Sequence, residues 1–521
     1  MDTDVLIVGA GPTGLMLGNQ LARRGVRAQI IDRHPGPARE TRALGVQART
    51  LEIYAHLGIV ERALDMGRRA SGANLWAQGK WMANVPLDVA GDGVTPYPYI
   101  LILGQDDNER IMGDRLRELG MSVQWNTELT ELRQRADRVD ATLRQSDGTR
   151  CTITAAWVAG CDGAHSAVRT ACGVAFQGAP YEHVFFVADT VATGGMVPDQ
   201  VNVYLWRDGF HLFFPMRGQD HWRVVGIVPE TLRDRADVDF DAVLPSLRQE
   251  AGETLAFLQC SWFSTYRIHH RAAEHFRDRR CFLLGDAAHI HSPVGAQGMN
   301  TGLQDAYNLG WKLALVVQGR ADPALLDSYP AEREPVARRL LETTDRAFRV
   351  VVSDNALAGL FRTRILARTM AFAMRRKSVR RFAFRVVSQT GIHYRSGPLS
   401  QSQDAFPGDA PQAGDRFPWM KLRLDDEGAR ADLFAVLDDT RFNLIVVGLP
   451  APAPDALGFG ELLKIHAVAE DPANDVELAR VRIPKPCFYL VRPDGHVGLC
   501  GARLDATALA RYAFDHLRLT H

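Results

Sequence analysis

Three glycines near the N-terminus have the spacing of a phosphate-binding loop. Gly9, Gly11 and Gly14 form the pattern G-x-G-x-x-G, with Pro12 and Thr13 between the second and third. An apolar strand at residues 5–8 precedes the pattern, and a helix is expected at residues 15–24. Such glycines let the backbone approach a pyrophosphate, which the first N–H groups of the helix then bind.

An acidic residue follows the second predicted strand, at the place where dinucleotide-binding folds bind a ribose. A second strand, at residues 28–31, ends at Asp32, which is followed by Arg33. An acid at this distance from the glycines can accept a hydrogen bond from a ribose hydroxyl, which contributes about 1.5–3 kcal/mol. The pattern alone does not distinguish one dinucleotide from another.

A second glycine-rich loop lies between residues 281 and 314. The apolar run at residues 281–284 predicts a buried strand, and Asp286 stands at its carboxyl end, where open α/β sheets bind ligands. Pro293, Gly295 and Gly298 then lead into a long amphipathic helix that is expected to begin at Met299 or Asn300. Glycines admit a flat ligand, and the N-terminus of the helix favours negative charge on it.

These motifs resemble a known family. The run GDAAHIHSPVGAQGMNTGLQDAYNLGWKLA is similar to the second FAD motif of the para-hydroxybenzoate-hydroxylase-like (group A) flavoprotein monooxygenases. The segment WVAGCDGAHSAVRTACG resembles the Asp-Gly motif of the same enzymes. The resemblance extends over essentially the whole chain. It points to the branch that hydroxylates phenols and polyketides.

The resemblance implies FAD as cofactor, NADPH or NADH as co-substrate, and dioxygen. It places Arg42 on the FAD phosphates and Gln105 on the ribityl chain. Asp162 either serves the pyrophosphate and the passage of NAD(P)H or only caps the following helix, and both readings stay open. The expected cofactor-binding residues are Gly9, Gly11, Pro12, Thr13, Gly14, Asp32, Arg33, Arg42, Gln105, Asp162, Asp286, Pro293, Gly295, Gln297, Gly298, Met299 and Asn300. Arg49 is interpreted as a surface charge and Glu109 as a carboxylate at a helix start.

The elements that position these residues indicate an α/β fold with a Rossmann-type FAD-binding domain formed by residues 1–72, 98–174 and 277–400. Residues 73–97 and 175–276 show the hairpin and alternating patterns of an inserted antiparallel-sheet substrate domain. A polar linker at residues 401–418 leads to residues 419–521. That last segment resembles the thioredoxin-like C-terminal domain of the same branch. It has no C-x-x-C pair, so we expect no redox activity from it.

Composition excludes several other classes of protein. The 521 residues carry no net charge at pH 7, which gives no global electrostatic case for binding nucleic acid. The seven cysteines are scattered without metal-ligand spacing, which favours a reducing compartment and predicts neither disulfides nor a metal site. The N-terminus has no basic region of a signal peptide, and no apolar run is long enough to span a membrane, so we expect a cytoplasmic protein.

A basic stretch follows the second FAD motif. No acidic residue occurs between Asp354 and Asp404, while arginines accumulate there. A membrane surface or a polyanion could use such a stretch. With zero net charge overall, a solvated face paired with acids elsewhere in the fold is the favoured interpretation.

The function that the resemblance implies is hydroxylation of a phenolic or polycyclic aromatic substrate through a flavin 4a-hydroperoxide. The catalytic residues stay unknown, and His211 is a weak candidate for assisting a phenol proton, since a structural histidine is the commoner case. A Baeyer–Villiger oxygenation and an antibiotic-inactivating hydroxylation on the same scaffold are alternatives. A flavin-binding protein without turnover is less favoured. The aromatic small molecule is the expected partner, and the protein is expected to be a monomer or a homodimer.

Overall fold

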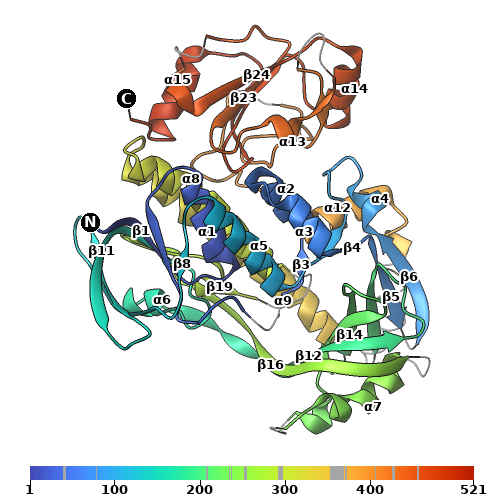
Figure 1. The fold of residues 1–521 in the computed structure, drawn as a ribbon. Coiled ribbons are helices and arrows are strands. Elements are labelled where there is room, and N and C mark those ends of the chain that lie inside the picture. The colour runs from blue at the N-terminus through green and yellow to red at the C-terminus, as the bar shows by residue number, and fades with distance from the viewer. Residues whose placement is uncertain are drawn as a thin grey trace.

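The computed structural model describes residues 1–38, 43–77, 79–206, 209–233, 235, 237–251, 255–291, 297–352, 369, 372–404, 406–424, 429–453 and 457–520. Three large sheets organise these residues, and Figure 1 shows the C-terminal sheet stacked on the helices of the first one. Within the described residues, no helix is long and apolar enough to cross a membrane.

The first sheet is of the Rossmann type. Its strands run in the order β17-β18-β11-β1-β2-β8. Strands β18, β11, β1, β2 and β8 pair with one another in parallel, and β17 is antiparallel to β18. The antiparallel strands β9 and β10 extend it beside β11. Bounds are β1 Thr3–Val8, β2 Ala28–Ile31, β8 Val123–Gln124, β9 Glu128–Gln134, β10 Val139–Arg144, β11 Arg150–Gly160, β17 Arg277–Asp278 and β18 Cys281–Leu283.

Helices cover this sheet and build one large apolar core with it. Helix α1 packs against α8 and α5, and Gly18 of α1 and Gly310 of α8 lie so close to neighbouring side chains that a Cβ there would collide with them. Bounds are α1 Pro12–Ala22, α2 Ala48–Leu57, α3 Val60–Met66, α4 Leu87–Gly91, α5 Gln105–Glu118, α6 Ala167–Ala171, α8 Gly298–Val317, α9 Ser328–Val352 and α12 Lys377–Val387. A small sheet of β3 Gly45–Val46, β7 Ile100–Ile102 and β4 Arg68–Ala70 joins α2, α3 and α5.

The second sheet has eight strands in the order β19-β16-β12-β15-β14-β13-β5-β6. It is antiparallel as expected, except that β5 pairs in parallel with β13. Helix α7 (Phe240–Ala251), which the sequence did not predict, packs on one face of it. Bounds are β5 Gly72–Ala77, β6 Lys80–Pro86, β12 Phe176–Thr193, β13 Val201–Trp206, β14 Gly209–Pro215, β15 His221–Ile227, β16 Ala256–Ala273 and β19 His289–Ile290.

The third sheet lies in the C-terminal part, in the order β20-β26-β25-β23-β24. Strands β23 and β24 are parallel, while β25 and β26 form an antiparallel hairpin. Bounds are β20 Gln401–Ser402, β21 Lys421–Leu422, β22 Ala431–Asp432, β23 Phe442–Val447, β24 Leu463–Val468, β25 Cys487–Val491, β26 Val497–Gly501, α13 Leu433–Val436, α14 Pro472–Arg480 and α15 Ala506–Asp515.

Buried ion pairs fasten the C-terminal part to the rest of the chain. Glu332 of α9 accepts hydrogen bonds from Lys312 of α8, at 2.7 Å, and from Arg492, at 2.5 Å. Arg49, which we interpreted as a surface charge, is also buried: it pairs with Glu52 at 3.0 Å and donates to the carbonyl oxygen of Asp494 at 2.6 Å. The interpretation was wrong because helical spacing cannot show that another domain covers this face.

Candidate active site

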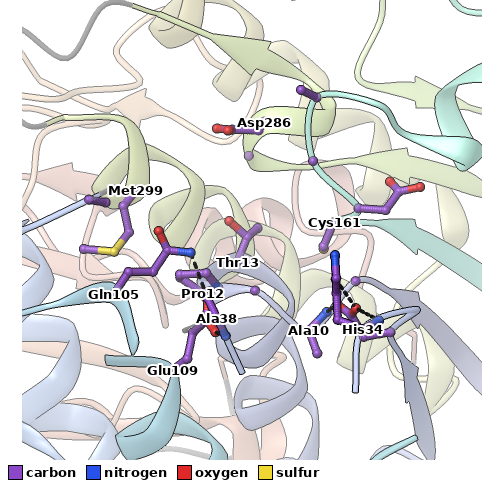
Figure 2. Close-up of a pocket in the computed structure, with 18 of the residues that line it drawn as sticks. Ala10, Pro12, Thr13, His34, Ala38, Gln105, Glu109, Cys161, Asp286 and Met299 are labelled. Carbon is purple, nitrogen blue, oxygen red and sulfur yellow. Dashed lines mark hydrogen bonds and ion pairs between the residues drawn. The ribbon is translucent and has the colours of Figure 1, made fainter. Parts of the chain in front are cut away.

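One cavity of about 1180 Å³ opens at the carboxyl ends of the parallel strands. It is larger than the roughly 300–1,000 Å³ of ordinary small-molecule sites, which leaves room for a dinucleotide and a further ligand. The first sheet and the second sheet both contribute to its wall. Figure 2 shows Thr13, Gln105, Asp286 and Met299 around the same space.

The glycine loop after β1 forms one end of the cavity. A Cβ on Gly14 would lie 1.9 Å from the Gly9 carbonyl oxygen, and one on Gly9, whose φ is +101°, would lie 2.4 Å from the Cys161 carbonyl oxygen. Among the described residues other than its own chain neighbours, none lies within 4 Å of the position of a Cβ on Gly11. Gly9 and Gly14 therefore shape the loop, while Gly11 leaves open the space that a pyrophosphate needs at the start of α1.

Asp32 holds this loop in place from the end of β2. One carboxylate oxygen accepts the Ala10 backbone N–H at 2.7 Å, and the other accepts the His34 backbone N–H at 2.8 Å. Asp32 and Arg33 both line the cavity. These two hydrogen bonds fix the position of the Asp32 carboxylate, which faces the space where a ribose would lie.

Asp286, at the end of β18, projects into the cavity. Asp286 is exposed to the cavity, and among the described residues its carboxylate has no hydrogen-bond partner; desolvation by the surrounding protein raises its pKa. A carboxyl group held in this way can bind a ligand hydroxyl without giving up a protein contact.

A buried network supports the backbone around Asp286. Asp305 of α8 accepts the Gly285 N–H at 3.0 Å, a hydrogen bond from His289 at 2.8 Å, and one from Arg333 at 2.6 Å. Burial alone would raise the pKa of Asp305, but Arg333, His289 and the Gly285 N–H together outweigh it and hold that pKa below its ordinary value. The sequence analysis missed Asp305 and Arg333 because neither contacts the cavity.

Asp162 caps the helix that follows it and also lines the cavity. One carboxylate oxygen accepts the Ala167 N–H at 2.6 Å and so caps the start of α6 together with Ser166. The other oxygen is buried beside the cavity without a hydrogen-bond partner, and burial raises the pKa of the group. An orphaned buried acceptor at this place fits a ligand that donates a hydrogen bond to it.

Gln105 lines the cavity as expected, but Glu109 differs from its interpretation. Helix α5 begins at Gln105, so Glu109 stands in its second turn, where it accepts hydrogen bonds from the Gln105 side chain and the Ala38 N–H, both at 2.8 Å. Burial raises the pKa of Glu109. The carboxylate orients Gln105 rather than complementing a helix end.

The second glycine-rich loop meets the cavity at the start of α8. Gln297, Gly298 and Met299 line it. Asn300 is instead buried: its side chain donates to the Gly45 carbonyl oxygen at 2.7 Å and accepts the Gln47 N–H at 2.9 Å. The predicted contacts of Arg42, Pro293 and Gly295 lie outside the described residues.

The wall opposite the dinucleotide motifs comes from the second sheet. Leu212, Phe214, Val225 and Tyr266 form an apolar and aromatic surface there, with Arg267 and His269 nearby. The sequence analysis did not name Tyr266. The alternation of strand β16 could have indicated Tyr266 only if the face turned to the cavity had been known.

His211, the candidate for proton transfer, faces away from this cavity. It directly precedes the lining residue Leu212 in β14, and its Nε2 lies 2.6 Å from Glu250 of α7. Its ring stacks on Trp206 at 5.6 Å. Because neighbouring strand residues point to opposite faces, the position of Leu212 in the cavity wall excludes His211 from it.

The comparisons with known proteins agree with this arrangement. A family model described as "FAD binding domain" matches residues 2–344. The 6-methylpretetramide 4-monooxygenase of Streptomyces rimosus is 34% identical, over 98% of this chain and 93% of that protein. The pentachlorophenol 4-monooxygenase of Sphingobium chlorophenolicum is 35% identical, over 95% and 86%. The anhydrotetracycline hydroxylase OxyS of Streptomyces rimosus superposes with a TM-score of 0.78 at 29% identity, covering 98% of this chain and 99% of that one.

The glycine loop with its open space at Gly11, the orphaned oxygen of Asp162 and the unpartnered carboxylate of Asp286 fit a bound FAD. With the family match and the full-length relatives, they show that this chain belongs to the FAD-binding-domain family of flavoprotein monooxygenases.

Proposed function

We propose that the protein is an FAD-dependent monooxygenase that consumes NAD(P)H and hydroxylates a phenolic or polycyclic aromatic substrate. The observation that carries the proposal is one continuous cavity, walled on one side by the dinucleotide-binding loops and on the other by Leu212, Phe214, Val225 and Tyr266. The two named relatives act, by their names, on a polycyclic and on a phenolic compound.

The positions of the cavity residues suggest which part of FAD or of the substrate each would bind. Bound FAD, once reduced by NAD(P)H, would activate dioxygen and supply the oxygen atom. Gly11 and Asp162 would bind the pyrophosphate end, Asp32 a ribose, and Asp286 with Gln105 the ribityl chain. The apolar wall of the second sheet would hold the aromatic ring and keep water from the reacting atoms.

The domain division at residues 1–72, 98–174 and 277–400 against 73–97 and 175–276 is part of the proposal. It is supported by the first and second sheets, whose strands fall into these two sets apart from the boundary residue Gly72 and strand β19, which belongs to the second sheet. For residues 419–521 we propose a thioredoxin-like domain, supported by the parallel pair β23–β24 and the hairpin β25–β26 with helix α15 after it. Its two cysteines, Cys487 and Cys500, are buried and free, which fits a packing role without redox chemistry.

The test is NAD(P)H oxidation by the FAD-loaded protein with a panel of phenols and polycyclic aromatics, with hydrogen peroxide measured in parallel. Strong stimulation with little peroxide and a hydroxylated product supports the proposal. A lactone or ester product would replace it by a Baeyer–Villiger oxygenation. Bound FAD without stimulation by any compound of the panel would contradict an aromatic hydroxylase.

A further inference from the structure

The described part of the basic stretch, residues 369 and 372–404, shows few contacts with acids. Within the described residues, none of its cationic side chains before residue 390 has a carboxylate at ion-pair distance. These side chains are Arg375, Arg376, Lys377, Arg380, Arg381 and Arg385. Among the described residues, no ion pair supports the favoured interpretation of a face neutralised by acids elsewhere in the fold.

Helix α12 presents cations and apolar groups on the same face. Arg381, Phe382, Arg385 and Val386 are all exposed, Phe382 at 70% and Val386 at 48%, and their spacing places them along one side of the helix. Phe384 on the opposite side is buried against α4, where it would touch a Cβ placed on Gly91. We call the four exposed residues the α12 face.

Further exposed apolar side chains belong to the segments around α12. Phe372, just before the helix, is 63% exposed, and Val89 of the neighbouring α4 is 56% exposed. Strand β6, which leads into α4, carries Trp81, which is 52% exposed. Figure 1 shows α12, α4 and β6 close together at one edge of the molecule. Large exposed apolar groups gathered with cations mark an interaction surface rather than an ordinary solvated one.

The composition of the α12 face selects the kind of partner. Like charges four residues apart, as in Arg381 and Arg385, destabilise a helix unless an anion lies against them. A second copy of this chain would bring the same cations against them. A nucleic acid would satisfy the arginines but leave Phe382 and Val386 in water. A bilayer with anionic headgroups would bind both the arginines and the apolar side chains, because arginines pair with the headgroups while apolar side chains enter the boundary with the acyl chains.

We propose that the α12 face docks the protein on an anionic membrane surface. The end of α12 is joined to the cavity, because the Val386 carbonyl oxygen accepts a hydrogen bond from Gln297 at 3.4 Å, and Gln297 lines the cavity. Gln389, just after the helix, donates to the Gln297 carbonyl oxygen at 3.3 Å and to Thr301 at 2.9 Å. A docked helix would thus place the cavity near the bilayer. Delivery of an apolar aromatic substrate from the membrane is a consequence that rests on the proposed function.

The test is sedimentation of the full-length, FAD-loaded protein with vesicles of phosphatidylcholine alone or with about one third of phosphatidylglycerol. We expect binding only to the anionic vesicles, and its loss at high salt. Since each cation at an anionic surface is worth about 1 kcal/mol, the double substitution R381Q/R385Q should weaken partitioning about 30-fold. F382S should weaken it with the charges intact.

The matched control is R503Q/R511Q, which removes two exposed arginines of the C-terminal part, neither of which has a carboxylate partner among the described residues. It should bind vesicles as the unmodified protein does. Equal binding by R381Q/R385Q, no binding of the unmodified protein to anionic vesicles, or binding to duplex DNA in place of vesicles would overturn the proposal. NAD(P)H oxidation with a water-soluble phenol, measured on the same variants, should not change, which separates this proposal from the proposed function.

Discussion

Replacing Asp305 by asparagine removes the charge at the centre of the network that holds the Asp286 loop. The substitution keeps the size of the side chain. It leaves the buried Arg333 without its carboxylate and replaces a charged acceptor for the Gly285 N–H and for His289 by a neutral one. We expect both the stability of the FAD-binding domain and its affinity for FAD to fall.

The magnitude follows from the burial of the pair. Arg333 and Asp305 are 0% and 1% exposed, and the distance between Nε and Oδ1 is 2.6 Å. Breaking a buried pair by removing one charge costs about 3–5 kcal/mol, because the remaining charge stays uncompensated. Urea unfolding of the apoprotein should therefore shift to a lower midpoint with an unchanged slope. Titration with FAD should give a weaker Kd.

The matched control is Asp327→Asn, which breaks the ion pair with Arg277 at the same distance of 2.6 Å. Asp327 is 76% exposed, so this change should cost less than about 1 kcal/mol. Equal effects of the two substitutions, or a loss below about 1 kcal/mol for D305N, would refute the argument that the buried network positions the Asp286 loop.

Three further predictions use other parts of the structure. Gly14→Ala should destabilise the protein, because its Cβ would lie 1.9 Å from a carbonyl oxygen. Gly11→Ala should instead leave the urea midpoint of the apoprotein unchanged and weaken FAD binding. An FAD affinity of G11A equal to that of the unmodified protein would contradict the pyrophosphate assignment. Phe214→Ala should raise the KM for the aromatic substrate, while Phe213→Ala, on the other face of the same strand, should cost about 3–5 kcal/mol of stability with little effect on KM. Burial raises the pKa of Glu332, but its two cationic partners outweigh this and hold it below its ordinary value, so the stability it contributes should be complete above about pH 4.5 and lost as the pH falls toward the folded-state pKa. The variant E332Q should show a flatter dependence of the urea midpoint on pH in that acidic range.

Local patterns were sufficient for much of the fold. The glycine loop, the strand at residues 28–31 and the hairpin before α15 depend on short-range turn chemistry and strand periodicity, which a sequence shows directly. Helix α7 was missed because Pro245 lies inside it and weakens the helical pattern. The start of α5 was placed four residues late, since no side chain caps its first turn.

The site was less predictable wherever it depends on contacts between distant segments. The alternation of β14 places His211 and Phe214 on opposite faces of the sheet. It does not show which of the two faces meets the cavity. The burial of Arg49 could not be predicted from its own helix, because it depends on contact with the C-terminal part of the chain. Asp305 and Arg333 do not line the cavity; they support the backbone near Asp286. No sequence motif identifies residues with such a supporting role.

The account depends on one cavity that brings reduced FAD, dioxygen and an aromatic ring together. The most direct test is turnover under ¹⁸O-labelled dioxygen with the best substrate of the panel, followed by mass spectrometry of the product. The account predicts one ¹⁸O atom in each product molecule for each NAD(P)H consumed. Oxygen derived from water, or NAD(P)H consumption that ends only in labelled hydrogen peroxide for every substrate, would contradict it.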